Sequence, residues 1–208
     1  MRRVCLFSLF LAVFFSGAVP RGNGQSDGID KIILDDFPGF HVLTVPERDS
    51  DTRAFIRAHF AKRNPSVVRA DFDGDGHLDY AVLLKNRKSG VAKFVILLCQ
   101  ENEHCKKACD EDITSYAGEV FIKTVPIGRR VSQTEAIDTK DYPPPVRLSS
   151  TGIEVTYFEK ARVVYYWNTK HKKIETIQTG GLARLSQTGI YTHDPVNACN
   201  GGVRHLEA

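Results

Sequence analysis

Hydrophobic residues along the chain recur at two spacings, and each spacing predicts its own kind of secondary structure. After Asp49-Ser50-Asp51, which offers N-cap residues, the apolar side chains fall on one face of a helix that runs to about Arg63. That face contains Phe55, Ile56 and Phe60. Asn64-Pro65 then ends the helix, because proline disfavours helical backbone in the residue before it.

Short apolar runs predict a mostly antiparallel sheet. Asp79 to Leu84 and Val91 to Cys99 form a hairpin around the turn Lys88-Ser89-Gly90. Their almost continuous apolar character is typical of strands buried on both faces. The other predicted strands are Phe40 to Val45, Ser66 to Ala70, Glu119 to Val125, Ile153 to Phe158, Arg162 to Trp167 and Lys173 to Thr179, of which the last three form a meander.

Two segments lack a clear period. Gln100 to Asp112 is charged and predicts a loop or a short helix, whereas Ile127 to Ser150 contains Pro143-Pro144-Pro145 and predicts a long exposed loop. The predicted fold class is therefore α+β, a mostly antiparallel sheet with one N-terminal helix.

The N-terminus has the pattern of a secretory signal peptide. A basic start at Arg2-Arg3 precedes the apolar run Val4 to Phe15, and Ser16-Gly17-Ala18 places small residues at a cleavage site. The alternative, an uncleaved membrane anchor, would need a longer apolar run. We expect a signal peptide at 1–18, a disordered linker at 19–30 and a single α+β domain at 31–208. The protein would then be secreted or periplasmic, with no stable insertion into a membrane after cleavage.

Four cysteines remain once Cys5 leaves with the signal peptide. They are Cys99, Cys105, Cys109 and Cys199. An even number in an exported protein favours two disulfides, and three pairings are possible. The alternative is a zinc site that also uses His104.

The segment 71–79 is the clearest chemical signal in the chain. Aspartates occupy its first, third, fifth and ninth positions, with Gly74 and Gly76 between them. Oxygen ligands at alternate positions of a tight loop suit a hard cation such as Ca²⁺, and glycine allows the sharp turn. The predicted ligands are Asp71, Asp73, Asp75, the backbone carbonyl of His77, and Asp79. The alternative is a solvated acidic turn without a metal.

This loop is not an EF-hand, because Val82 stands where that loop needs a glutamate. The pattern Asp-x-Asp-Gly-Asp-Gly-x-x-Asp, followed by an apolar strand, resembles the calcium motif of FG-GAP and VCBS-type repeats. The resemblance covers Val67 to Leu84 and implies the same five ligands, in a strand–calcium loop–strand hairpin. Those families stack several repeats, whereas this chain has one copy, so a full propeller is not implied.

Other patterns favour packing over chemistry. The meander carries Tyr157, Phe158, Tyr165, Tyr166 and Trp167, which we expect to pack in the core and across strands, although a platform for sugar rings is the alternative. Neither a Gly-x-Ser-x-Gly elbow nor a His-Glu-x-x-His motif occurs. Asn168 to Lys173 is a basic hairpin tip, which we interpret as a solvated turn.

Composition limits the remaining functions. The chain of 208 residues has 42% hydrophobic residues, 25% charged residues and a net charge of +3. This balance gives no reason to expect nucleic-acid binding. The sequence thus predicts an exported, non-enzymatic binding module for a protein or glycan partner, in which Ca²⁺ is structural. A secreted hydrolase and a structural accessory subunit of an envelope complex are the alternatives.

Overall fold

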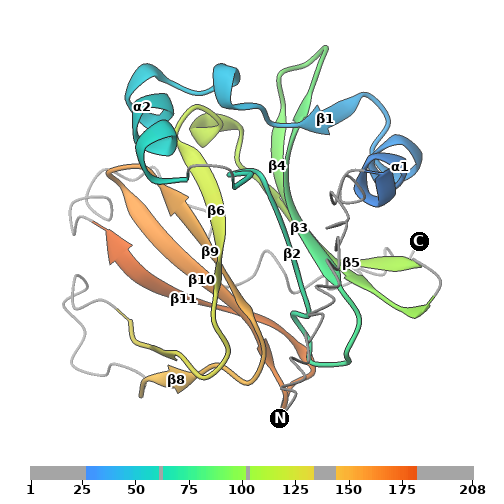
Figure 1. Cartoon of the computed structure of the whole chain (residues 1–208), viewed down its shortest axis with the longest axis vertical. Coiled ribbons are helices and arrows are strands. Elements are labelled where there is room, and N and C mark those ends of the chain that lie inside the picture. The colour runs from blue at the N-terminus through green and yellow to red at the C-terminus, as the bar shows by residue number, and fades with distance from the viewer. Residues whose placement is uncertain (1–26, 61–62, 102–103, 134–143, 182–208) are drawn as a thin grey trace, which may run out of the picture.

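The computed structural model describes residues 27–60, 63–101, 104–133 and 144–181, and within them it is built on two antiparallel sheets. In the first sheet β3 (Asp79–Asn86) pairs with β1, β2 and β4, and β4 pairs with β5. The bounds of its other strands are β1 Phe40–Val42, β2 Val67–Ala70, β4 Ala92–Cys99 and β5 Cys105–Asp112. Figure 1 shows this sheet on the right.

The second sheet has the order β11-β10-β9-β6, and a separate two-stranded ribbon joins β7 to β8. These strands are β6 Val120–Val125, β7 Arg130–Val131, β8 Val146–Arg147, β9 Gly152–Tyr157, β10 Ala161–Asn168 and β11 Lys173–Gly181. The α+β prediction is therefore confirmed, and so is the meander of β9, β10 and β11. The sheets are joined where Ile122 N–H of β6 donates to the Pro65 carbonyl, 2.9 Å away.

The alternation of side chains along β3 explains why its middle part, Tyr80 to Leu84, is apolar without interruption. Ala81 and Leu83 face the second sheet and join the main core, whereas Tyr80, Val82 and Leu84 belong to a second cluster on the opposite face. A strand covered on both faces buries every side chain, which removes the polar alternation of a half-exposed strand.

The main core lies between the two sheets. Tyr165 of β10 is 1% exposed, and its ring centroid lies 4.9 Å from that of Phe94 on β4. Trp167 packs against the same cluster, whereas Tyr166 points to a smaller cluster on the other face of its sheet. The packing interpretation therefore fits Tyr165, Tyr166 and Trp167, each of which packs in one of these two clusters.

Two helices cover the sheets, and one of them is absent from the sequence prediction. The predicted helix is α2, Ser50–His59, which ends earlier than Arg63 and packs Ile56 and Phe60 against Phe121 of β6. The additional helix is α1, Asp27–Asp36. It buries Ile29 and Ile33 against the outer face of the first sheet, so the predicted linker at 19–30 is wrong for residues 27–30.

Two other predictions for local structure are corrected. The loop or helix expected at Gln100 to Asp112 is largely strand β5, an edge strand whose charged side chains suit a solvent-facing edge. Within the expected loop at Ile127 to Ser150, β7 and β8 pair with each other, and Val131 and Leu148 are buried. A short η1 helix, Val45–Glu47, takes the end of the strand expected to reach Val45.

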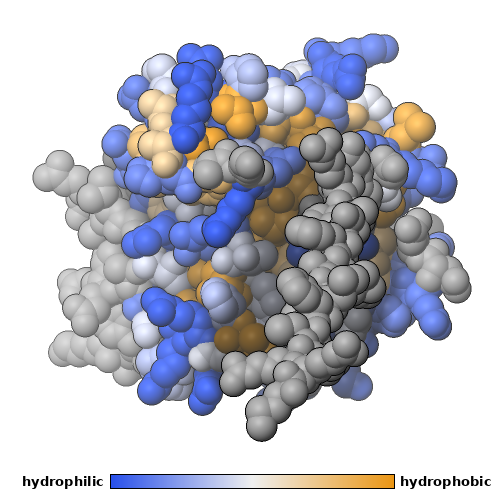
Figure 2. Space-filling view, viewed as in Figure 1, coloured by the Kyte–Doolittle hydropathy of each residue, from blue (hydrophilic) through white to orange (hydrophobic). Residues whose placement is uncertain are grey.

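Hydrophilic residues dominate the outer parts of the face drawn in Figure 2, and hydrophobic residues show in its recessed centre. No helix among the described residues is both long enough and apolar enough to cross a membrane. The expected signal peptide at 1–18 and most of the expected linker lie outside the described residues.

Candidate metal centre

The acidic loop connects β2 to β3, two adjacent antiparallel strands. Ala70 and Asp79 stand opposite each other at the end of the ladder, so the loop closes directly on the strand pair. Gly74 and Gly76 have φ values of +83° and +91°, a backbone conformation that side chains with a Cβ rarely adopt. The two glycines therefore allow the tight turn that the sequence pattern predicts.

Asp79 is the buried end of the loop. It is 0% exposed, and its two carboxylate oxygens accept backbone N–H groups from both sides. Phe72 N donates to Oδ2 over 2.6 Å, and Cys99 N donates to Oδ1 over 2.8 Å. Burial raises the pKa of Asp79 to about 6 despite these bonds, and the negative charges of Asp73 and Asp75 act in the same direction.

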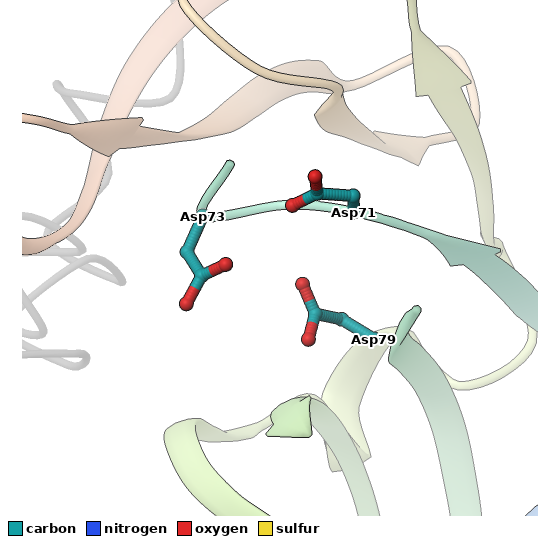
Figure 3. A group of neighbouring side chains, drawn as sticks. All are labelled: Asp71, Asp73 and Asp79. Atoms are coloured by element: carbon teal, nitrogen blue, oxygen red, sulfur yellow. The ribbon is translucent and has the colours of Figure 1, made fainter. Parts of the chain in front are cut away.

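Asp71, Asp73 and Asp79 form a cluster of carboxylates. Each offers one oxygen, and the three oxygens lie within 4.8 Å of one another. Figure 3 shows the three side chains directed toward a common point. Two oxygens bound to one Ca²⁺ at 2.3–2.6 Å can be no more than about 5 Å apart, so the cluster is compatible with a single ion. This group could hold a metal ion.

The cluster is electrostatically costly without a cation. Burial raises the pKa of Asp73, and the charges of Asp75 and Asp71 raise it further. Asp71 is held in place by the loop backbone, since its carboxylate accepts N–H groups from Gly74 at 2.6 Å and Gly76 at 3.0 Å. The loop thus fixes three carboxylates at short range, an arrangement that a divalent cation would stabilise.

Asp75 and His77, the other two residues predicted to bind the ion, are not part of the three-carboxylate cluster. The Asp75 carboxylate accepts the backbone N–H of His77 over 2.8 Å. Asp75 would have to rotate to reach an ion bound by the other three. His77 follows in the same loop, and its backbone carbonyl was the expected ligand.

Ser150 is a residue of the site that the sequence analysis did not identify. Its hydroxyl donates to the Phe72 carbonyl over 2.6 Å, and the serine is only 7% exposed. Phe72 itself is 1% exposed and belongs to the main core. The loop is therefore anchored between the sheets by an apolar side chain and a hydrogen bond from a distant segment, for which a local sequence pattern gives no signal.

A disulfide borders the candidate metal centre. Cys99 and Cys105 stand opposite each other on β4 and β5 and are bonded. This bond is one of the disulfide pairs that the sequence left open. It also means that neither cysteine is free to bind zinc in the alternative site. Cys109 is disulfide-bonded too, whereas Cys199 lies outside the described residues. Because Cys99 N–H also donates to Asp79, the Cys99–Cys105 bond fixes backbone that supports the buried carboxylate.

Replacing both Cys99 and Cys105 with serine is expected to lower the free energy of unfolding by about 2 kcal/mol. The bond closes a short loop, with a sequence separation of 6, and the chain-entropy model assigns a loop of this size about that value. Urea denaturation of the variant and of the wild type measures the difference. A matched Ser89→Ala, Ser149→Ala variant, which alters two exposed serines, controls for surface substitution. An unchanged midpoint would contradict a stabilising role for this bond.

The chain was compared with family models, curated proteins and solved structures, and none of them matches it.

Proposed function

We propose that the protein is an exported binding module that holds Ca²⁺ in the 71–79 loop, where the ion has a structural role. The observation that carries this proposal is the convergence of Asp71, Asp73 and Asp79, with three oxygens within 4.8 Å. A loop that concentrates negative charge at the junction of two strands gains most from a cation that neutralises it.

Calcium suits this donor set better than the other common metals. The cluster supplies carboxylate oxygens only, which hard cations prefer, and zinc or copper would favour imidazole or thiolate. Ca²⁺ accepts six to eight oxygens in flexible geometry, so Asp75, the His77 carbonyl and water would complete its shell. The resemblance to FG-GAP and VCBS-type loops supports the same ligand set.

The N-terminal sequence supports export. Its basic start, apolar run and small residues match a signal peptide, and a disulfide at Cys99–Cys105 suits an oxidising compartment. The mature protein would then be secreted or periplasmic, and extracellular sites of this kind bind Ca²⁺ with a Kd of roughly 10⁻⁴ to 10⁻³ M. A protein or glycan is the proposed partner, and no catalytic role is proposed.

Calcium is expected to stabilise the protein against unfolding, and EDTA is expected to remove the effect. A ligand at a hundredfold excess over its Kd adds about 2.7 kcal/mol to the free energy of unfolding. Thermal melts of the mature chain with about 100 mM CaCl₂, a hundredfold excess over a Kd of about 1 mM, and with EDTA measure the shift. Asp73→Asn keeps the size of the side chain but removes one charged ligand, so its melts in calcium and EDTA are expected to differ far less.

Asp36→Asn is the matched control, because Asp36 is an exposed carboxylate outside the loop. It is expected to keep the full calcium effect. If wild-type protein melts at the same temperature in calcium and in EDTA, the metal proposal fails. If Asp73→Asn responds to calcium as strongly as Asp36→Asn does, the ligand assignment fails.

A further inference from the structure

A pocket of about 300 Å³ lies next to the acidic loop, which contributes part of its lining. Its lining comes from helix α1, from Gly76 to Leu78 of the acidic loop, and from the Cys99–Cys105 disulfide. Its volume is at the lower end of the range for small-molecule sites. The pocket is separate from the point where Asp71, Asp73 and Asp79 converge, but it shares the loop with that point.

Tyr80 gives the pocket an unusual polar group. Its side chain is 6% exposed, yet its hydroxyl makes no hydrogen bond with any described residue. The hydroxyl oxygen lies beside α1, since a Cβ added at Gly28 would stand 3.1 Å from it. Gly28 and Tyr80 both line the pocket. Because His41 Nδ1 is the only buried side-chain polar atom without a hydrogen-bond partner among the described residues, the unpartnered Tyr80 hydroxyl is not sealed from solvent and a ligand in the pocket can reach it.

Arg69 adds a fork of N–H donors in a defined position. Its guanidinium carbon lies 5.3 Å from the centroid of the Tyr80 ring, which orients the group over the aromatic face. Within the described part of the chain it forms no ion pair or hydrogen bond. Three further polar side chains line the pocket without a hydrogen bond to the described residues, namely His77, Gln100 and Glu101.

The chemistry of these groups indicates the class of ligand. Arg69 carries a positive charge and Glu101 a negative one, so the pair favours neither a simple anion nor a simple cation. Arginine, glutamine and glutamate each end in a planar group that can bind two neighbouring hydroxyls. Arginine donates hydrogen bonds to them, glutamate accepts hydrogen bonds from them, and glutamine does both. Ile32 and Leu78 add apolar surface to the same pocket. A ligand that presents hydroxyls at its edges and C–H groups on its faces satisfies both requirements.

We propose that this pocket binds a single saccharide unit of a glycan, with Tyr80, Arg69 and Gln100 as hydrogen-bonding residues. This inference rests on the proposed binding role and assigns it a ligand class and a position. Because Gly76, His77 and Leu78 belong both to the pocket wall and to the acidic loop, Ca²⁺ that orders the loop also orders the wall. Calcium is thus expected to strengthen saccharide binding.

Two-dimensional ¹H–¹⁵N NMR titration of the full chain, with its disulfides intact, tests the proposal. The probes are D-glucose, D-galactose, D-mannose and N-acetyl-D-glucosamine, each raised to tens of millimolar in the presence of calcium. Cyclohexanol serves as an apolar ring with one hydroxyl, and inorganic phosphate as a simple anion. We expect saturable shifts of the Gly28, Gly76 and Leu78 amides with at least one sugar, and weaker effects from both controls.

Tyr80→Phe and Arg69→Gln are each expected to weaken that sugar about tenfold, the equivalent of about 1.4 kcal/mol. The Tyr80 hydroxyl has no hydrogen-bond partner among the described residues, so Tyr80→Phe is expected to leave the melting temperature of the ligand-free protein unchanged. Arg57→Gln, an exposed arginine on α2, is the control and is expected to bind the sugar like the wild type.

The inference is overturned if none of the four sugars gives saturable shifts, if both pocket variants bind like Arg57→Gln, or if phosphate or cyclohexanol binds as tightly as the best sugar. The same samples keep this result distinct from the metal proposal. If a sugar binds but calcium has no effect, the saccharide proposal stands and the calcium proposal fails. If calcium stabilises the protein but no sugar binds, the calcium proposal stands and the saccharide proposal fails.

Discussion

Replacing Arg48 with methionine is expected to lower the free energy of unfolding by about 4 kcal/mol, a loss typical of buried charged groups whose partners are left behind. Arg48 is only 3% exposed, and no carboxylate among the described residues forms a salt bridge with it. Its guanidinium donates instead to three carbonyls and a hydroxyl, from Leu43, Thr44, Val120 and Ser66. Burial lowers the pKa of Arg48 to about 10, so the group remains charged at neutral pH.

The cost follows from what these bonds join. Nε–H donates to the Val120 carbonyl of the second sheet at 2.7 Å, and Nη2 donates to Ser66, just before β2 of the first sheet, at 2.6 Å. Methionine fills similar space but leaves these acceptors without a donor, and each unsatisfied buried group costs about 1–3 kcal/mol. The side chain therefore fastens the two sheets together where they approach each other.

Urea denaturation measures the effect, and two further variants define its origin. Arg48→Lys keeps the charge but has one nitrogen in place of the planar fork, so we expect it to recover only a small part of the loss. Arg57→Met alters an exposed arginine on α2 and is expected to change stability by less than about 0.5 kcal/mol. Equal stability of Arg48→Met and Arg57→Met would show that the buried network contributes nothing.

Local patterns predicted the parts of the fold whose cause is local. The acidic loop is specified by the spacing of four aspartates and two glycines, and the hairpin of β3 and β4 by two apolar runs with a turn between them. Helix α1 was missed although Ile29, Ile33 and Phe37 repeat at helical spacing, because aspartates and a glycine surround them. That repeat was the available signal, and burial against β3 is what makes the segment helical.

Long-range contacts explain the rest. Strand β5 is charged, and only its ladder with β4 makes it a strand, which no window of its own sequence reveals. The same ladder places Cys99 opposite Cys105 and so selects one pairing among three. In the metal centre, the donors to Asp79 and Phe72 come from Cys99 and Ser150, which the fold alone brings to the loop. The sequence therefore predicts the aspartates of the cluster, and the tertiary structure supplies the hydrogen bonds that hold their loop.

Asp79→Ala is expected to lower the free energy of unfolding by about 3 kcal/mol at neutral pH in saturating calcium. The variant loses a carboxylate of the proposed calcium site, and with it the linkage of about 2.7 kcal/mol that a ligand provides at a hundredfold excess over its Kd. It also leaves the N–H groups of Phe72 and Cys99 without an acceptor. Asp36→Ala is the matched control, since this carboxylate is exposed and lies outside the acidic loop, and it is expected to cost much less.

In EDTA the cost of Asp79→Ala is expected to depend on pH, because burial holds the pKa of Asp79 at about 6 in the folded protein. The unfolded value is about 3.9, so between these values the folded state binds more protons, and wild-type stability falls as pH rises. The contribution of Asp79 is largest below about pH 4 and is reduced by about 3 kcal/mol above its folded pKa. The alanine variant lacks this dependence, so its cost should lose most of that amount between pH 4 and pH 7, from about 3 kcal/mol to less than about 1 kcal/mol. Calcium should restore the cost at pH 7, because the ion compensates the charge that burial disfavours.

A cost in EDTA that does not change with pH would mean that Asp79 titrates normally, and a cost that calcium does not restore would mean that Asp79 binds no ion.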